Sequence, residues 1–320
     1  FSLLLFSPPP QYPSPMDPLE SSVRHRLAEI RRTQGPHVAA ALDDLLRRIR
    51  FNHRGTYFLA PAAQPVLQLP GWVEASGGER LHDGVVEDLA ESAAVAYLHV
   101  RLQDDWLDEG TGDAAQVMML SDVLFTRHQS LLARVVGQDP GFWDLFQGLW
   151  SGYAEASLLE RELFAAGTGY DDAAFAEVQR RSHPLVLPGA AVLVLQGRWG
   201  EVESLRGFVE ALVAAHQRFH DLVDAQEDLR LGNPTYIVQR FGGLDGAARL
   251  NKRLFLEGGF DEVVTEVMGE LDRASEHAAA LGMDGAADFV EVRRTTVRET
   301  QRGVFERLFE QILETGTDEP

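Results

Sequence analysis

The chain contains no cysteine and only one lysine, Lys252, among its 320 residues. The absence of cysteine excludes disulfides, thiolate nucleophiles, cysteine-ligated zinc sites and iron–sulfur clusters. Positive charge is scarce as well, since 29 Lys and Arg stand against 49 Asp and Glu and give a formal net charge of −20. This balance argues against sequence-independent binding to nucleic acid and against binding to an anionic membrane surface, because both need clustered basic side chains.

Long apolar runs are also missing. No segment reaches the roughly 18 consecutive apolar residues of a membrane span, so none is predicted. The apolar start, Phe1–Phe6, is short, lacks a basic flank and runs into three prolines, which is unlike a secretory signal. We therefore expect a cytoplasmic protein with a disordered tail over residues 1–22, one helical domain over residues 23–315 and a short tail over residues 316–320.

The pattern of apolar residues is helical from about Val23 to the end of the chain. Strand-like alternation is rare, and glycine and proline divide the sequence into segments whose apolar residues recur three or four positions apart. This pattern predicts an all-α fold, a single large bundle of about ten helices around a central cavity.

One predicted helix, ending near Gly110, carries its acidic residues on the face expected to be buried. Its apolar stripe follows helical spacing: Val86, Leu89, Ala93, Tyr97 and Val100. The same spacing then leads to Asp104 and Asp108, whereas a solvated charge run belongs on the opposite face.

A second predicted helix repeats this arrangement. Val209, Val213 and His216 lead by the same spacing to three polar residues: His220, Asp224 and Asp228. Both acidic clusters fall at helix C-termini, where the exposed carbonyls disfavour carboxylates by roughly 0.3–1 kcal/mol each. The alternative interpretation is a pair of solvated helix ends, but two clusters on core-facing stripes favour a metal site. Carboxylate oxygens suit Mg²⁺, and carboxylates with Mg²⁺ between them would form a receptor for a diphosphate.

Two sequence motifs extend this interpretation. Residues 104–108 read D-D-W-L-D, and residues 220–228, about 115 positions later, read H-D-L-V-D-A-Q-E-D. This pair resembles the motifs of class I isoprenoid synthases, the superfamily of trans-prenyl diphosphate synthases and class I terpene cyclases. The resemblance implies an isoprenoid synthase-like fold, three Mg²⁺ ions (Mn²⁺ being the alternative) and a geranyl, farnesyl or geranylgeranyl diphosphate substrate. The superfamily often dimerises, so a homodimer is one expectation.

The resemblance also implies roles for the acidic residues. The metal ligands would be Asp104, Asp108, His220, Asp224 and Asp228. Two further aspartates, Asp105 and Asp221, would each support these ligands by pairing with an arginine. Asp105 is also counted among the catalytic residues. His220 departs from the family pattern because imidazole prefers softer metals, so it could bind through water, orient Asp224 or favour Mn²⁺.

Basic residues are implied at the diphosphate. Arg181, followed by Ser182, occupies the place where prenyltransferases have Lys-Thr and would be the catalytic contact to the leaving group. Arg180 is the competing choice, and Arg230 is a further diphosphate contact.

Aromatic residues would line the pocket for the hydrocarbon chain. Tyr97 lies two turns before Asp104 on the same stripe, and Phe219 directly precedes His220. Aromatic faces can stabilise a carbocation, although such residues are more often part of an ordinary core.

The leading functional hypothesis is a class I terpene synthase, a lyase. It would ionise an allylic diphosphate with Mg²⁺, and the carbocation would then cyclise or rearrange and end by deprotonation or water capture. Chain-elongating synthases carry a second diphosphate site, but residues 109–113 contain no arginine and residues 53–55 no lysine. One alternative is a prenyl diphosphate synthase with a diverged donor site. The other is a non-catalytic protein of the same fold that binds a prenyl diphosphate or a partner.

Overall fold

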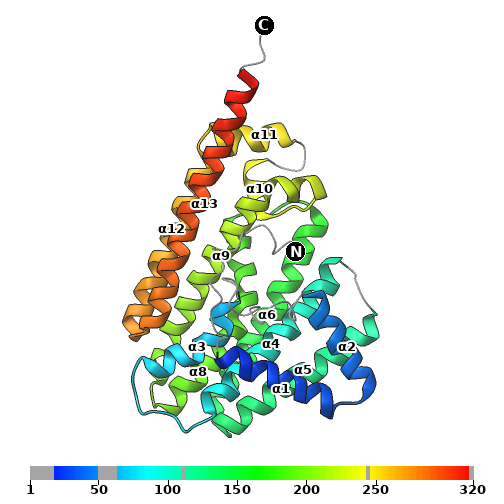
Figure 1. Cartoon of the computed structure of the whole chain (residues 1–320), viewed down its shortest axis with the longest axis vertical. Coiled ribbons are helices and arrows are strands. Elements are labelled where there is room, and N and C mark those ends of the chain that lie inside the picture. The colour runs from blue at the N-terminus through cyan, green and yellow to red at the C-terminus, as the bar shows by residue number, and fades with distance from the viewer. Residues whose placement is uncertain (1–17, 50–62, 110–112, 243–245, 317–320) are drawn as a thin grey trace. The chain divides into compact units, whose positions relative to one another are not determined.

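A computed structural model describes residues 18–49, 63–109, 113–242 and 246–316, and in these ranges the chain forms helices and turns without any strand (Figure 1). The α-helices are α1 (Pro18–Thr33), α2 (Pro36–Arg48), α3 (Gln64–Ala75), α4 (Val85–Glu109), α5 (Ala114–Val136), α6 (Pro140–Ala166), α7 (Asp172–Val178), α8 (Val186–Leu195), α9 (Val202–Leu231), α10 (Tyr236–Phe241), α11 (Ala247–Asn251), α12 (Gly259–Leu281) and α13 (Asp284–Gly316). Two 3-10 helices, η2 (Gln179–Leu185) and η3 (Trp199–Glu201), and a π-helical turn, η4 (Lys252–Leu256), complete the set. The predicted all-α fold is confirmed. Within the described ranges, no helix combines the length and the apolar character that crossing a bilayer requires.

Helix α1 begins earlier than the sequence pattern indicates. The predicted tail extends to residue 22, but the helix starts at Pro18. Glu20 is buried there and accepts hydrogen bonds from Arg24 one turn later, and Val23 enters the core. The polar residues that look like a tail therefore form a paired helical turn.

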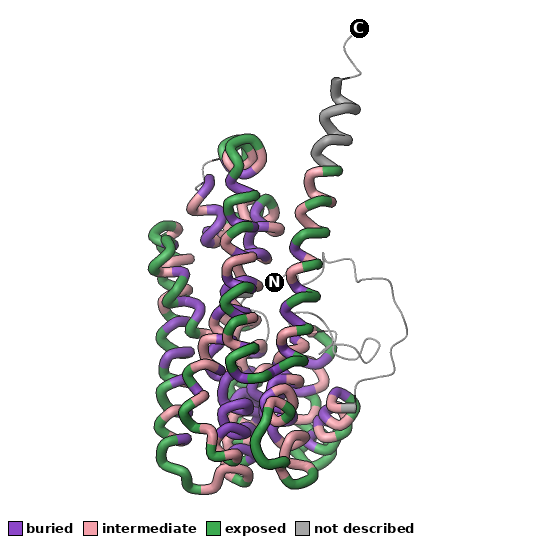
Figure 2. The backbone as a smooth tube through the Cα atoms, turned by 90° about the vertical axis from the view of Figure 1, so that its left-hand side faces the viewer, coloured by how far each residue is buried: buried purple, intermediate pink, exposed green. Residues whose placement is uncertain are grey.

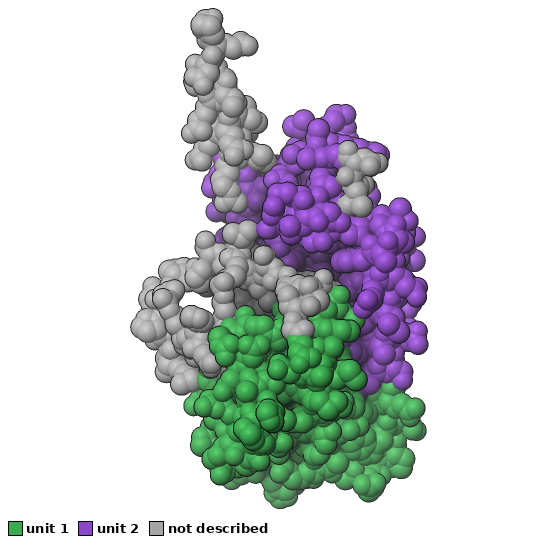
Figure 3. Space-filling model, turned by 90° about the vertical axis from the view of Figure 1, so that its right-hand side faces the viewer, with its two compact units in different colours: residues 1–148, 184–202 green, residues 149–183, 203–320 purple. Residues whose placement is uncertain are grey.

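The chain is organised as two compact units (Figure 3). Unit 1 comprises residues 1–148 and 184–202, and unit 2 comprises residues 149–183 and 203–320. Helix α6 contributes to both units, since the boundary falls between Gly148 and Leu149.

Unit 1 is built around the pairing of α4 with α5, to which α1, α2, α3 and α8 add further layers. Helix α8 is buried on all sides over residues 186–193, which explains why its sequence is apolar without a polar face. Figure 2 draws the buried residues of the described chain in purple. The acidic end of α4 thus extends from a helix that is fixed along its length by packing.

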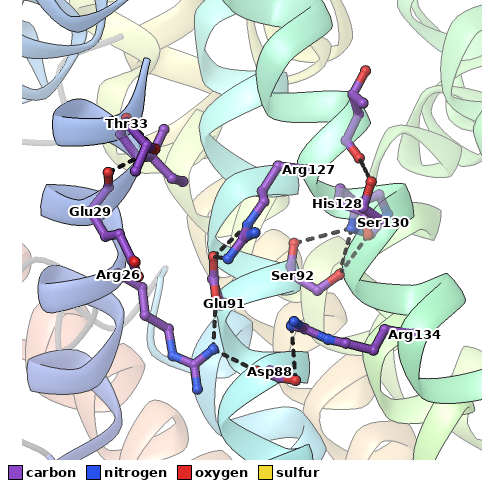
Figure 4. Close-up of polar contacts among 12 residues, drawn as sticks. Arg26, Glu29, Thr33, Asp88, Glu91, Ser92, Arg127, His128, Ser130 and Arg134 are labelled. Carbon is purple, nitrogen blue, oxygen red and sulfur yellow. Dashed lines mark hydrogen bonds and ion pairs between the residues drawn. The ribbon is translucent and has the colours of Figure 1, made fainter.

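A buried ion-pair network ties α1, α4 and α5 together in unit 1 (Figure 4). Glu91 has no exposed surface, and its carboxylate accepts hydrogen bonds from Arg26 at 2.8 Å and from Arg127 at 2.7 Å. Asp88, one turn earlier, pairs with Arg26 and, at 2.9 Å, with Arg134. Because buried carboxylates must be paired, this network fixes how the three helices pack.

Unit 2 contains the long helix α9 and the hairpin of α12 and α13. The turn between α12 and α13 needs Gly282, whose φ of +70° lies in the left-handed region that glycine adopts without strain. Arg218 of α9 donates to Glu266 of α12 at 2.8 Å and to the Tyr236 hydroxyl of α10 at 3.0 Å. The same guanidinium lies over the ring of Phe175 at 4.4 Å. These contacts hold α9 just before its acidic end.

Candidate functional site

The first acidic cluster forms the last turns of α4 in unit 1. Asp104 is half-buried, and Asp105 accepts a hydrogen bond from Arg101 at 2.8 Å and lies 3.7 Å from an Arg48 nitrogen. The arginine partner predicted for Asp105 is therefore present. Asp108 belongs to the same helix, and its side chain lies outside the described part of the structure.

The second acidic cluster lies on the C-terminal half of α9 in unit 2. His220 and Asp224 are one turn apart, with 3.4 Å between Nε2 and Oδ2. Burial lowers the pKa of His220 and raises that of Asp224, because it disfavours the charged form of each group. These two residues thus form a close, largely desolvated pair.

Asp228 is held by the loop that follows α9. Asn233 donates to Oδ1 at 3.4 Å and Thr235 donates to Oδ2 at 3.3 Å, so each carboxylate oxygen has a partner. The loop can fold back because Gly232 adopts a φ of +78°, and the Asn233 amide donates to the Asp228 carbonyl at 2.8 Å. Burial raises the pKa of Asp228 to about 6, and the two hydrogen bonds oppose that rise.

Asp221 points into the interior of unit 2. It is 3% exposed and accepts a hydrogen bond from Gln217 at 2.7 Å. Burial raises its pKa well above the usual range, whereas the positive charge of Arg181 lowers it. Gln217 is thus the hydrogen-bonded partner of Asp221, and Arg181 acts on Asp221 through its charge.

The two adjacent arginines have different surroundings. Arg181, on η2, pairs with Glu160 of α6, and both side chains are mostly buried. Arg180 pairs with Glu177 at 3.0 Å, and both of those side chains are largely exposed. Of the two candidates for the diphosphate contact, Arg181 is the one whose charge acts on Asp221 of α9.

The other predicted residues have the following environments. The Ser182 hydroxyl donates to the Gln179 carbonyl at 2.8 Å. Arg230 is exposed and lies 3.4 Å from Glu227. Tyr97 packs against the apolar core of unit 1, and Phe219, on α9, is 1% exposed.

The side-chain donor atoms of the α9 cluster can be compared with the ligands that a divalent metal ion requires. Among the described residues, no three His, Asp or Glu side chains converge closely enough to form a metal site on their own. The oxygen-rich set of Asp224 and Asp228, with His220 beside them, nevertheless suits Mg²⁺ or Mn²⁺ as part of a ligand shell. The raised pKa of Asp228 agrees with this, since a desolvated carboxylate gains most from a nearby cation.

Several contacts of the α9 site involve residues that the sequence analysis missed. Gln239 donates to the Pro234 carbonyl at 2.8 Å and accepts from the Tyr170 amide at 3.1 Å, so it ties the loop after α9 to the start of α7. Glu160 lies 21 positions before its partner Arg181 in an ordinary acidic helical segment. No spacing rule connects such residues, because the contacts form between different elements.

Comparison with known proteins identifies the fold. No family model matches the sequence, and no curated protein matches it either. Among solved structures, a geranylgeranyl pyrophosphate synthase from Lactobacillus brevis is similar with a TM-score of 0.59 and 15% identity, over 80% of this chain and 95% of that chain. A polyprenyl synthase from Roseobacter denitrificans is similar with a TM-score of 0.57 and 16% identity, over 85% of this chain and 98% of that chain.

The chain therefore has the all-helical, isoprenoid synthase-like fold of these trans-prenyl diphosphate synthases. The resemblance seen in the two acidic motifs is confirmed at the level of the fold.

Proposed function

We propose that the protein is a metal-dependent enzyme that ionises an allylic prenyl diphosphate. The observation that carries the proposal is the position of the two motifs, at the C-terminal ends of α4 and α9 in a fold shared with prenyl diphosphate synthases. Acidic helix ends are unfavourable in isolation, and a bound cation would remove that cost.

We propose that each acidic motif supplies metal ligands. They are Asp104 and Asp108 of α4, and Asp224, Asp228 and His220 of α9. Bound Mg²⁺ supplies positive charge that stabilises the departing diphosphate.

The remaining polar residues would orient the ligands and the leaving group. Asn233 and Thr235 fix the two oxygens of Asp228, and Arg101 fixes Asp105. Arg181 would contact the diphosphate with its planar guanidinium, which matches phosphate oxygens well. Tyr97 and Phe219 are the proposed apolar wall residues.

Two fates of the carbocation are supported by different observations. The similar solved structures are both prenyl diphosphate synthases, which favours chain elongation with a second diphosphate substrate. The absence of arginine from residues 109–113 favours a terpene cyclase, which needs no second diphosphate site. We put elongation first because it agrees with the fold comparison, and the cyclase second. Residues 53–55, the other part of the donor-site argument, lie outside the described residues.

Product analysis distinguishes these activities. Geranyl, farnesyl and geranylgeranyl diphosphates are each incubated with Mg²⁺, with and without isopentenyl diphosphate, and the products are identified by gas chromatography–mass spectrometry after phosphatase treatment. Elongation predicts longer prenyl alcohols only when isopentenyl diphosphate is present. Cyclisation predicts cyclic or rearranged hydrocarbons or alcohols without it.

Variants test whether the proposed ligands are responsible. Asp104→Ala and Asp228→Ala should each abolish turnover, whereas Asp43→Ala, which changes an acid in a surface pair with Arg31 at 3.3 Å, should not. If none of the three substrates is consumed with Mg²⁺ or Mn²⁺, both enzymatic hypotheses are wrong. Metal-dependent thermal stabilisation by diphosphate without turnover would then support the non-catalytic alternative.

A further inference from the structure

Glu160 makes a specific contact with Arg181 in unit 2. The carboxylate Oε2 of Glu160, on α6, accepts a hydrogen bond from Arg181 Nη1, on η2. The exposed fractions of the two side chains are 12% and 19%, so little of the pair reaches solvent. A pair in this environment holds its geometry better than a surface ion pair, because water and salt screen it less.

The surroundings of this pair connect it to the acidic end of α9. The Tyr170 hydroxyl donates to Glu160 at 3.5 Å, so the carboxylate has a second partner. The backbone amide of the same Tyr170 donates to Gln239 at 3.1 Å, and Gln239 donates to the Pro234 carbonyl at 2.8 Å. Glu160 is therefore connected through Tyr170 and Gln239 to the loop that follows α9.

The neighbouring pair of Arg180 and Glu177 provides an internal comparison. It has the same chemistry at 3.0 Å, but its side chains are 44% and 60% exposed, and it connects residues three apart in one segment. By contrast, Glu160 and Arg181 join two different elements. Among the described residues, Arg181 is thus the one of these two adjacent arginines whose ion pair reaches another helix.

We propose that Glu160 is a positioning residue that holds the Arg181 guanidinium ready for a diphosphate and moderates its charge. The inference rests on the proposed function, since it assumes that Arg181 meets a phosphorylated ligand. A long side chain that is ordered in advance loses less conformational entropy when the ligand arrives, and preorganised donors stabilise a developing anion best. The carboxylate also offsets part of the arginine charge, so ground-state binding of the diphosphate is weaker than with Arg181 alone.

The test is the Glu160→Gln variant, which keeps the size and one hydrogen-bond acceptor but removes the charge. We expect kcat to fall by at least about fivefold, because the guanidinium is less well held. We expect the KM for the allylic diphosphate to stay constant or fall, because the site becomes more positive. Glu177→Gln is the matched control and should leave both constants unchanged.

Two results would overturn the proposal. One is a smaller loss of kcat in Glu160→Gln. The other is a rise in KM together with a lower melting temperature, which would show a merely structural role.

A binding measurement separates this inference from the proposed function. If the wild-type protein consumes no prenyl diphosphate, calorimetry with inorganic diphosphate and Mg²⁺ still tests Glu160. Tighter binding by Glu160→Gln and weaker binding by Arg181→Ala would support the inference without the activity. Equal binding by Glu160→Gln and wild type, or no binding by wild type, would contradict it.

Discussion

The hydroxyl of Thr235 offers a sharp test of how the α9 cluster is organised. It donates to Asp228 Oδ2 at 3.3 Å. Thr235 also precedes the first residue of α10, but its side chain makes no capping hydrogen bond there. Thr235→Val keeps the branched shape and replaces the hydroxyl with a methyl group, so the hydrogen bond that is lost is the one to Asp228.

The expected magnitude follows from the geometry of that hydrogen bond. A hydrogen bond to a charged group contributes about 1.5–3 kcal/mol, and a length of 3.3 Å places this one at or below the lower end. A loss of about 1–1.5 kcal/mol corresponds to roughly five- to thirteenfold weaker binding of a metal ligated by Asp228.

The assay is the Mg²⁺ concentration that gives half-maximal thermal stabilisation in the presence of inorganic diphosphate, which does not depend on turnover. Thr265→Val is the control, because that hydroxyl donates to the Asp261 carbonyl within α12 at 2.8 Å. The reasoning is refuted if Thr235→Val stays within twofold of wild type or if Thr265→Val shifts equally.

Three further predictions concern stability and the diphosphate contact. Glu91→Ala should lower the free energy of unfolding, measured by urea denaturation, by about 2–4 kcal/mol, because Arg26 and Arg127 lose their buried carboxylate partner. The control Glu29→Ala, which removes a surface pair with Arg32 at 3.7 Å, should lower it by less than about 0.5 kcal/mol. Burial lowers the pKa of His128 to about 3, so the unfolded chain binds more protons than the folded one below about pH 6.5, and the free energy of unfolding falls on acidification. This residue alone should lower the free energy of unfolding by about 2 kcal/mol between pH 7 and pH 5, and the profile of stability against pH should be correspondingly flatter in His128→Gln. Arg181→Ala should lower kcat/KM by about two orders of magnitude and Arg180→Ala by less than about threefold, and equal losses would contradict the assignment of the diphosphate contact.

Much of the fold could be predicted from the sequence, because the spacing of apolar residues along a single segment is enough to indicate a helix. Apolar residues three and four apart predicted a helix ending near Gly110, and α4 ends at Glu109. The same spacing predicted α9, which ends at Leu231 before Gly232. The start of α1 could not be predicted, because Glu20, Ser21 and Ser22 are polar, and the pairing of Glu20 with Arg24 and the packing of Leu19 against the core appear only in the structure.

The sequence by itself determined the fold class and the acidic residues that end two long helices, since both depend on spacing along one helix. Only the tertiary structure decided the contacts that come from other elements, such as Arg48 of α2 on Asp105 of α4. Arg101 on Asp105 and Gln217 on Asp221 are partners four positions apart within one helix, and Asn233 and Thr235 follow Asp228 closely in the chain. The tertiary structure also separated Arg181 from Arg180, which are adjacent and chemically identical in the sequence. The physical reason is that hydrogen bonds and burial are set where different elements pack together, and local periodicity carries no record of which distant residue will lie opposite.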